Sequence, residues 1–269
     1  MRDLTVVIPS IGRESLVNSI NSVDISAKIV IGISKDDYEK LSSEARDYID
    51  ESLNTDIVIF ESRLSPGDVK DLLIFYQVDT KYVTIMDDDD QFNPGFLNWA
   101  LTILEDHVKT PCWVTSLWSS QVTKEDFGIF EFIGSQVQTT KKLFDYNSYT
   151  PEYFKEHIYP NSSTVFRTEL YKMVPRSFRY QGKYGDDILP NLWLMSRYSG
   201  IQAKFSGAVI GTEENTVSRN ISIDDLEQCI ARLNFAIKYS TGLRDYYLSL
   251  AVSKMLVNVL QRYFHKSNG

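Results

Sequence analysis

Blocks of hydrophobic residues alternate with amphipathic segments through the first third of the chain. Continuous apolar runs rich in β-branched residues predict four strands, at 4–9, 27–34, 56–62 and 81–86. Apolar residues at helical spacing predict the helices between them, within 10–23, 36–53 and 65–78. Strands that alternate with helices are typical of a mostly parallel sheet with helices on both faces. We therefore expect an α/β fold with a Rossmann-like central sheet flanked by helices.

The pattern is less regular in the rest of the chain. Helices are predicted at 93–108 and 186–200, and strands at 112–119, 127–137 and 203–211. The first two of these strands are expected to be antiparallel. The second helix has Pro190 in its first turn and Gly200 at its end. Residues 138–182 give no clear pattern, whereas the chain from Ser222 to about Lys266 is predicted to be helical.

Composition narrows the class of protein. The chain has 269 residues, of which 43% are hydrophobic, so one large domain or two small ones would have ample core. The net charge of −8 argues against a surface that coats nucleic acid broadly, and leaves a local basic patch open. The two cysteines, Cys112 and Cys229, lack a C-x-x-C spacing, which argues against a disulfide scaffold or a cysteine zinc site.

The sequence predicts neither a membrane span nor a signal peptide. It contains no uninterrupted apolar stretch of about 18 residues, which is the length a transmembrane helix requires. The first residues, MRDLTVVIPSIGR, run directly into a strand-like segment. We expect a cytoplasmic protein, with a peripheral membrane location as the alternative if the C-terminal helices lie on a membrane surface.

Four consecutive aspartates, Asp87 to Asp90, follow the fourth predicted strand in the segment YVTIMDDDDQFNPGF. Their charges would repel one another unless the run is a solvated turn or a cation lies nearby. Asp87 and Asp89 have the i, i+2 spacing that puts two side chains on one side of an extended segment. Mg²⁺ and Mn²⁺ often bind one or two carboxylates together with substrate phosphates. The abrupt change from apolar strand to acidic run favours such a metal site.

Other uses of the acidic run fit less well. In a calcium-binding EF-hand loop that began at Asp87, the sixth position would be glycine, but it is Phe92. The glycine-rich phosphate loop that ends in Lys-Ser/Thr is absent from the sequence. In open α/β sheets, ligands bind beyond the carboxyl ends of the strands. The PSIGR loop, Ser34, Arg63 and the aspartates should meet there.

The order of these motifs resembles that of the inverting family 2 glycosyltransferases, which have the GT-A fold. In that family a strand ends in an Asp-x-Asp motif, followed by a proline and a helix, and Asp87 to Asp90 with Pro94 match it. A second match is YGDDILPNLWLMSRYSG, in which Asp186 replaces the usual glutamate. The resemblance covers roughly residues 4 to 215. It implies a catalytic domain at 1–215, with a nucleotide-sugar-binding half at 1–110 and an acceptor half at 111–215, and a C-terminal helical extension at 216–269.

The resemblance implies a metal ligand set and a donor site. Asp89 would be the principal ligand of Mn²⁺ or Mg²⁺, with Asp87 as the second. Asp36 is offset from the family's usual position at the end of the second strand, and Lys70 stands where many relatives have arginine. Residues expected to contact the nucleotide-diphosphate sugar are Pro9, Ser10, Arg13, Ser34, Asp36, Lys70, Asp87, Asp88 and Arg219.

The resemblance also implies how the acceptor is bound and activated. Asp187 would be the general base that takes the proton from the acceptor hydroxyl, so that one direct displacement inverts the anomeric configuration. The alternative is that the Asp186–Asp187 pair only caps the following helix. Asp186 would bind acceptor hydroxyls. Trp118 would stack on a sugar unless it belongs to the core. Arg176 and Arg179 would bind an acceptor phosphate unless they are simply solvated.

The sequence therefore predicts a metal-dependent glycosyltransferase that uses a nucleotide-diphosphate sugar. The hydroxyl-bearing acceptor would be a glycan, a lipid-linked glycan or a nucleic acid. A nucleotidylyltransferase is a rival class, but its glycine- and arginine-rich opening loop is missing. A non-catalytic glycan- or nucleotide-binding module is the other alternative. The C-terminal helices would pack on the domain or form an oligomer contact.

Overall fold

The computed structural model describes residues 3–106, 113–119, 143–144, 161–179, 188–195, 198 and 200–211. The predicted strand at 127–137, the C-terminal extension at 216–269 and the domain boundary between them lie outside these residues. Among the described residues, no helix is both long and apolar enough to span a membrane.

The four strands predicted in the first third of the chain are present and parallel. They are β1 (Leu4–Ser10), β2 (Lys28–Ser34), β3 (Thr55–Phe60) and β4 (Tyr82–Ile85). Their order in the sheet is β3-β2-β1-β4, and Val7 of β1 pairs with Val30 on one side and with Ile85 on the other. A central position explains why β1 is buried along its whole length, whereas β3 is partly exposed at the sheet edge.

Helices connect these strands, with one difference from the prediction. The helices are α1 (Leu16–Asn21), α2 (Lys35–Lys40), α3 (Ser43–Glu51), α4 (Pro66–Tyr76) and α5 (Phe96–Asp106). The prediction of a single helix at 36–53 is wrong. The chain becomes extended at Leu41, and a second helix, α3, begins at Ser43. Leu41 is buried, and the hydroxyl of Ser42 accepts a hydrogen bond from the backbone N–H of Ala45, which caps the new helix.

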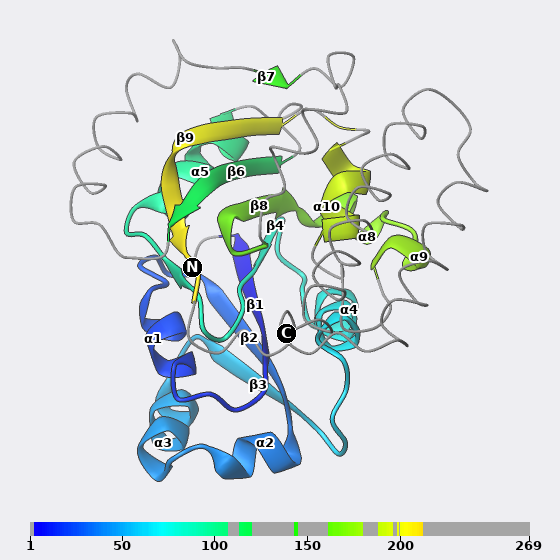
Figure 1. The fold of residues 1–269 in the computed structure, drawn as a ribbon. Helices are drawn as coiled ribbons and strands as arrows, with labels where there is room; N and C mark the ends of the chain where they lie inside the picture. The colour runs from blue at the N-terminus through cyan, green and yellow to red at the C-terminus, as the bar shows by residue number, and fades with distance from the viewer. Residues whose placement is uncertain are drawn as a thin grey trace, which may run out of the picture.

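Helices cover both faces of the sheet, as predicted, and divide the core in two. On one face Val6 and Ile8 pack with residues of α1, α3 and α5. On the other face Val7 and Val30 pack with α4 and with elements from later in the chain. Figure 1 shows α1 and α3 to the left of the first strands and α4 to their right. Alternation of side chains along β1 is what sends successive residues to opposite cores.

The second half of the sheet is mixed. It consists of β5 (Gln91–Phe92), β6 (Trp113–Ser119), β7 (Leu143–Phe144), β8 (Thr164–Arg167) and β9 (Gly200–Val209). The described part of the sheet has nine strands, ordered β3-β2-β1-β4-β8-β6-β9-β5, with β7 beside β9. β6 is antiparallel to β8, but parallel to β9. β8 lies within the segment that gave no clear sequence pattern, because its four residues are too few to show a period.

Short helices complete the described fold. They are the 3-10 helix η2 (Asn161–Ser163), α8 (Thr168–Lys172), α9 (Arg176–Arg179) and α10 (Ile188–Met195). Gly200 was predicted to end the helix at 186–200. It is instead the first residue of β9, and α10 ends at Met195. A Cβ atom at Gly200 would lie 2.0 Å from Cδ2 of the buried Trp113 ring, so this position has no room for a side chain.

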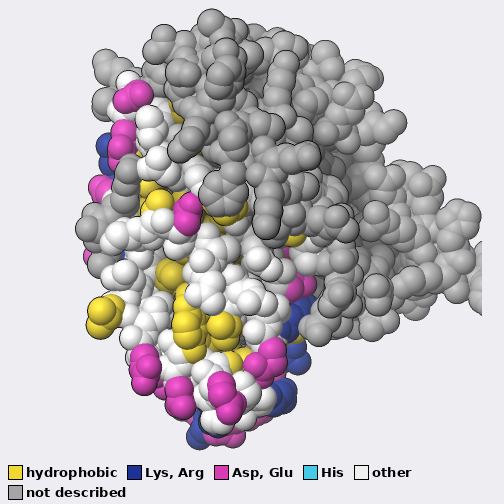
Figure 2. All heavy atoms as spheres, turned by 90° about the vertical axis from the view of Figure 1, so that its left-hand side faces the viewer, with side chains coloured by type: hydrophobic (Ala, Val, Ile, Leu, Met, Phe, Trp, Pro, Cys, Tyr) yellow, Lys and Arg dark blue, Asp and Glu magenta, His cyan; other side chains and the backbone are white. Residues whose placement is uncertain are grey.

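The face of the molecule on the side of α1 and α3 is acidic at one end. Figure 2 shows this face, with Asp and Glu side chains gathered over its lower part, where Figure 1 places α2 and α3. α3 alone exposes Glu44, Asp47, Asp50 and Glu51. Lys and Arg side chains lie beside them in Figure 2, so this end of the face carries charges of both signs.

We expect Gly200→Ala to lower the free energy of unfolding by about 1–3 kcal/mol, which is the usual cost of overpacking a core. The Trp113 ring cannot move aside easily, because it is buried and its Nε1 donates a hydrogen bond of 3.0 Å to the carbonyl oxygen of Tyr198. Urea unfolding measures the change. Ser43→Ala, at an exposed position of α3, is the control and should cost almost nothing; an equally small effect of Gly200→Ala would contradict the packing described.

Candidate functional site

Polar segments that follow the four parallel strands meet at one edge of the sheet, as predicted. The loop after β1 contacts Asp88, which follows β4, through Ser10, Ile11 and Arg13. The same loop touches the segment after β2. Gly12 has a φ of 79°, and a Cβ atom there would lie 2.3 Å from the carbonyl oxygen of Asp37. Only glycine suits this left-handed conformation and close approach.

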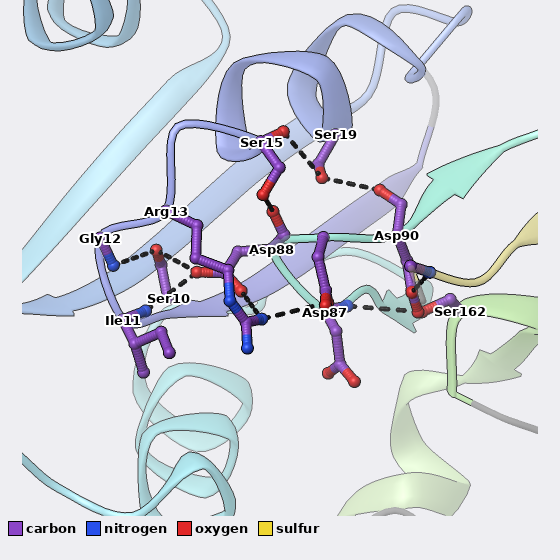
Figure 3. A network of polar contacts seen from close by, with 12 residues as sticks. Ser10, Ile11, Gly12, Arg13, Ser15, Ser19, Asp87, Asp88, Asp90 and Ser162 are labelled. Atoms are coloured by element: carbon purple, nitrogen blue, oxygen red, sulfur yellow. Dashed lines mark hydrogen bonds and ion pairs between the residues drawn. The ribbon is translucent and has the colours of Figure 1, made fainter. Parts of the chain in front are cut away.

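Asp88 holds the loop after β1 in place (Figure 3). One carboxylate oxygen, Oδ2, accepts hydrogen bonds from the Ser10 hydroxyl at 2.7 Å and from the Ile11 backbone N–H at 2.9 Å. The other, Oδ1, pairs with Nη1 of Arg13 at 2.7 Å. Its side chain is only 4% exposed. Asp88 therefore holds the loop after β1 against the segment after β4, and its predicted contact with the sugar nucleotide stays a prediction.

Asp90 is the second buried aspartate and ties the acidic run to distant segments. Its carboxylate accepts hydrogen bonds from the hydroxyl of Ser162 and from the backbone N–H of Gly211. Its backbone carbonyl accepts another from the hydroxyl of Ser19 at 2.6 Å. The pKa of Asp90 is raised to about 7, chiefly by burial and also by the neighbouring charges of Asp89 and Asp88, whereas the hydrogen bonds from Ser162 and Gly211 lower it.

Asp87 and Asp89 are the more exposed members of the run. Asp87 is exposed, and its backbone N–H donates a 3.4 Å hydrogen bond to the hydroxyl of Ser162. The side chain of Asp89 is 16% exposed, and its Oδ1 lies 3.1 Å from Nη1 of Arg13. Burial thus alternates along the run, with Asp88 and Asp90 inside. The run is not the extended segment that the i, i+2 argument assumed, because Asp88 and Asp89 lie in a turn in which the backbone N–H of Asp90 donates a 3.1 Å hydrogen bond to the carbonyl oxygen of Asp87.

The donor set suits a divalent cation that is completed by phosphate oxygens. No group of three or more His, Cys, Asp or Glu side chains among the described residues is placed to hold a metal ion. Mg²⁺ and Mn²⁺ in nucleotide sites commonly take only one or two carboxylates, however, and the substrate supplies further oxygens. Asp87 and Asp89 fit that smaller requirement.

A second polar corner lies at the end of β2. Asp37 is buried, and its carboxylate is held by the hydroxyl of Ser34 at 2.8 Å, by Nζ of Lys40 at 2.7 Å and by Nε of Arg63 at 3.5 Å. Desolvation would raise the pKa of Asp37, but the hydrogen bonds from Lys40 and Ser34 and the positive charges outweigh it and lower the pKa below its usual value. Asp37 therefore stays negatively charged and is held in place beyond the carboxyl end of β2.

Sequence reasoning missed Asp37 and named its neighbour Asp36. Asp36 is exposed on α2, whereas Asp37 faces the end of the strand. A signal for this was present, because Ser34 and Asp37 form a Ser-x-x-Asp capping pair. Such a pair turns the side chain of its fourth residue back toward the helix start. Ser34, which was predicted to contact the sugar nucleotide, caps α2 by accepting a hydrogen bond from the backbone N–H of Asp37.

Two other residues that were predicted to contact the sugar nucleotide are buried in the fold. Pro9 is buried in β1 opposite Gly32 of β2, so it shapes the strand end before the loop. Lys70 lies in the first half of α4 with 3% of its surface exposed and takes part in an interaction within the protein. A phosphate would have to replace that interaction to reach Lys70.

The basic residues predicted to bind the acceptor have different surroundings. Arg179 is 12% exposed, and its Nη1 pairs with the carboxylate of Asp71 on α4 at 3.1 Å. Its guanidinium also lies 4.0 Å from the centre of the Phe75 ring. Arg179 therefore packs α9 against α4, and its predicted contact with the acceptor stays a prediction. Arg176 remains exposed, and Trp118 belongs to β6, but its side chain lies outside the described residues.

Asp186, Asp187 and Arg219 also lie outside the described residues. α10 begins at Ile188, directly after Asp187. From α10, Nδ2 of Asn191 donates a 3.2 Å hydrogen bond to Oδ1 of Asn161 in η2. Asn161 precedes Ser162, which contacts Asp87 and Asp90. The helix that follows the predicted base is thus linked to the acidic run.

The fold is shared with solved structures, although no family model and no curated protein matches the chain. S. aureus TarS residues 1–349 in complex with UDP-GlcNAc superposes with a TM-score of 0.66 at 14% identity, covering 98% of this chain and 73% of that one. The same fragment with UDP gives 0.58 at 14% identity, covering 98% and 72%. A longer TarS structure gives 0.56 at 14% identity, and this chain spans only 44% of it. The likeness in fold confirms the predicted GT-A architecture.

We expect Asp88→Ala to lower the free energy of unfolding by about 1–3 kcal/mol, because the Ser10 hydroxyl and the Ile11 N–H lose their buried acceptor, whereas Arg13 keeps its ion pair with Asp89. The matched control is Asp87→Ala, one residue away and exposed, which should change stability by about 0.5 kcal/mol at most. Urea unfolding in the presence of a chelator compares the two variants. Equal losses would contradict the division between buried and exposed aspartates.

The raised pKa of Asp90 predicts a pH-dependent stability. The folded protein holds the Asp90 proton up to about pH 7, whereas the unfolded chain loses it near 3.8. The contribution of this group is therefore fully present below its unfolded pKa and is lost as the pH rises through the folded value. Asp90→Asn, which stays neutral, should gain stability relative to the native protein as the pH rises from 4 to 8. Urea unfolding across this range with a chelator present measures the difference; a constant difference would contradict it.

Proposed function

We propose that the protein is a metal-dependent glycosyltransferase that moves a sugar from a nucleotide-diphosphate sugar to an acceptor hydroxyl with inversion. The observation that carries the proposal is the meeting of Asp37, the loop after β1 and the acidic run at the carboxyl edge of parallel strands. This edge is where open α/β sheets bind nucleotides. The TarS structures with UDP-GlcNAc and with UDP, which share the fold, support a nucleotide-sugar ligand for this edge.

The donor nucleotide would lie across the ends of β2 and β1. Asp37 keeps its negative charge, and an N–H of the base or a ribose hydroxyl would replace one of its two exposed partners, Lys40 or Arg63, to bind its carboxylate. We assign it the role that Asp36 was expected to have. Ser34 and Arg63 hold the Asp37 carboxylate in orientation, which fixes its acceptor lone pairs before the nucleotide arrives.

The diphosphate would lie at the end of β4, where Asp87 and Asp89 would hold Mn²⁺ or Mg²⁺. The bound cation would act as a Lewis acid toward the departing diphosphate. Asp90 and Asp88 would not be ligands, because protein donors occupy their carboxylates. Their part is to fix the backbone of the acidic run, so that the two outward carboxylates are placed before the substrate binds. Arg219 is proposed as a further diphosphate contact.

Asp187 would take the proton of the acceptor hydroxyl, and the hydroxyl oxygen would then attack the anomeric carbon directly. One displacement inverts the configuration and requires no nucleophilic side chain. The hydrogen bond between Asn191 and Asn161 supports this role, because it links the start of α10 to η2 and thereby to the acidic run. Asp186, Trp118 and Arg176 are proposed to bind the acceptor, which would be a cell-surface glycan, a lipid-linked glycan or a nucleic acid.

We expect the protein to release nucleoside diphosphate from a sugar nucleotide when Mn²⁺ is present, and to form a product of inverted anomeric configuration when an acceptor is supplied. Asp187→Asn should lower the transfer rate by about 10²–10⁴ while donor binding survives, because general base catalysis contributes that much. Coupled detection of the diphosphate measures the rate, and NMR of the anomeric proton gives the configuration. Asp36→Asn, on the exposed side of α2, is the control.

Three outcomes would contradict the proposal in different ways. Release of pyrophosphate in place of nucleoside diphosphate would indicate nucleotidylyl transfer. Binding of sugar nucleotides without turnover would indicate a non-catalytic module. Normal turnover by Asp187→Asn, or a retained configuration, would remove Asp187 from its role and leave the Asp186–Asp187 pair as a helix cap.

A further inference from the structure

Arg13 places a positive charge against the carboxylate that is proposed to be the principal metal ligand. Its Nη1 lies 2.7 Å from Oδ1 of Asp88 and 3.1 Å from Oδ1 of Asp89. The Arg13 side chain is only 14% exposed, so solvent screens these contacts weakly. The repulsion among the four aspartates is therefore reduced by the protein itself, because the Arg13 guanidinium lies between two of them.

The backbone of Arg13 is fixed where the loop after β1 enters α1. The carbonyl oxygen of Arg13 accepts a 3.1 Å hydrogen bond from the backbone N–H of Leu16. The Ser15 hydroxyl donates one of 2.9 Å to the backbone carbonyl of Asp88. The first hydrogen bond ties Arg13 to the start of α1 and the second ties its neighbour Ser15 to the acidic run, so the guanidinium reaches Asp88 and Asp89 from a fixed base. Its side-chain torsions remain the means by which it would change partners.

We propose that Arg13 is a built-in counter-ion that makes metal binding depend on the diphosphate. Without nucleotide the guanidinium pairs with Asp89 and competes with a divalent cation for that carboxylate. When a diphosphate is present, the guanidinium pairs with phosphate oxygens and releases Asp89 to the metal. The inference rests on the proposed metal site and adds to it a residue that sets how metal and donor bind together.

The charges of the groups favour this exchange. A guanidinium and a divalent cation beside the same carboxylate repel each other, which weakens metal binding in the absence of another anion. The planar guanidinium of arginine can donate two hydrogen bonds at once to the oxygens of a diphosphate, which makes arginine a strong phosphate ligand. Moving the guanidinium from Asp89 to phosphate removes the repulsion. Because binding free energies are reciprocal, the metal must then strengthen diphosphate binding by the same factor as the diphosphate strengthens metal binding.

Titration with Mn²⁺, with UDP absent or saturating, tests the proposal. The free Mn²⁺ is followed by electron paramagnetic resonance, so the readout is binding and not turnover. Without UDP, Arg13→Gln should bind Mn²⁺ more tightly than the native protein, by about 5–150-fold, the usual range of coupling between two ligands. The factor by which UDP strengthens Mn²⁺ binding should shrink in the variant by a similar amount.

The control is Lys28→Gln, which removes the same charge from the opposite end of β2. Lys28 pairs with Asp56 at 3.4 Å and with Asp79 at 3.9 Å, away from the acidic run, so its loss should leave Mn²⁺ affinity unchanged. If Arg13→Gln does not fold, as circular dichroism would show, the double variant Arg13→Gln/Asp88→Asn removes both charges of the buried pair. It should show the same tighter Mn²⁺ binding.

The outcomes separate this inference from the function on which it rests. Equal Mn²⁺ affinities and an equal UDP effect in native protein and variants would overturn the role of Arg13 and leave the metal site standing. A gain in affinity that Lys28→Gln reproduces would reduce the effect to net charge and would also overturn it. An absence of Mn²⁺ binding by every form, with or without UDP, would overturn the metal site together with the inference.

Discussion

The carboxylate of Asp88 is the interaction on which the candidate site depends. It lies at the end of a central strand and gathers the loop after β1 through the Ser10 hydroxyl, the Ile11 N–H and the Arg13 guanidinium. A buried carboxylate with three donors is strongly held, and the donors would each be costly to leave unpaired. Through this one group the sheet fixes the loop against the acidic run, and Gly12 then brings the loop against the segment after β2.

Four adjacent aspartates are tolerated because their charges are handled separately. Asp88 is balanced by Arg13, and Asp90 has a pKa of about 7, so near neutrality it is only partly ionised. Asp87 is exposed to solvent, whereas Asp89 is only 16% exposed and shares the Arg13 guanidinium with Asp88. The cost of the buried pair is the desolvation that raises the pKa of Asp90, and its benefit is a rigid backbone beneath the two outward side chains.

Much of the first half of the fold could be predicted from the sequence, because its signals are local. Continuous apolar runs identified the parallel strands, and the helix starts are marked by Ser34 and Ser65, both of which accept a capping hydrogen bond. Tertiary contacts decided what was missed. Arg179 looked like a basic loop residue until Asp71 and Phe75 were seen beside it, and Gly200 looked like a helix end until its approach to Trp113 was known. Asp37 and Asp36 have the same residue type, and only the turn of the helix start separates them.

The two steps of the proposed reaction, donor binding and attack by the acceptor, require different things of the fold. Donor binding needs polar groups at the ends of strands. Parallel strands bring their carboxyl ends together on one side of the sheet, so segments close to one another in the sequence can supply these groups. Attack by an acceptor needs a base at a set distance from the donor, and Asp187 comes from a segment far away in sequence. If Asp187 is that base, the contacts of η2 would help to fix the helix that follows it, because Ser162 holds Asp90 while its neighbour Asn161 holds Asn191 on α10. These side chains are buried, so the link from α10 to the acidic run is a packed one. A direct displacement depends on that distance more than on any single charge, and buried amide and hydroxyl contacts preserve a distance without adding charge to an already acidic site.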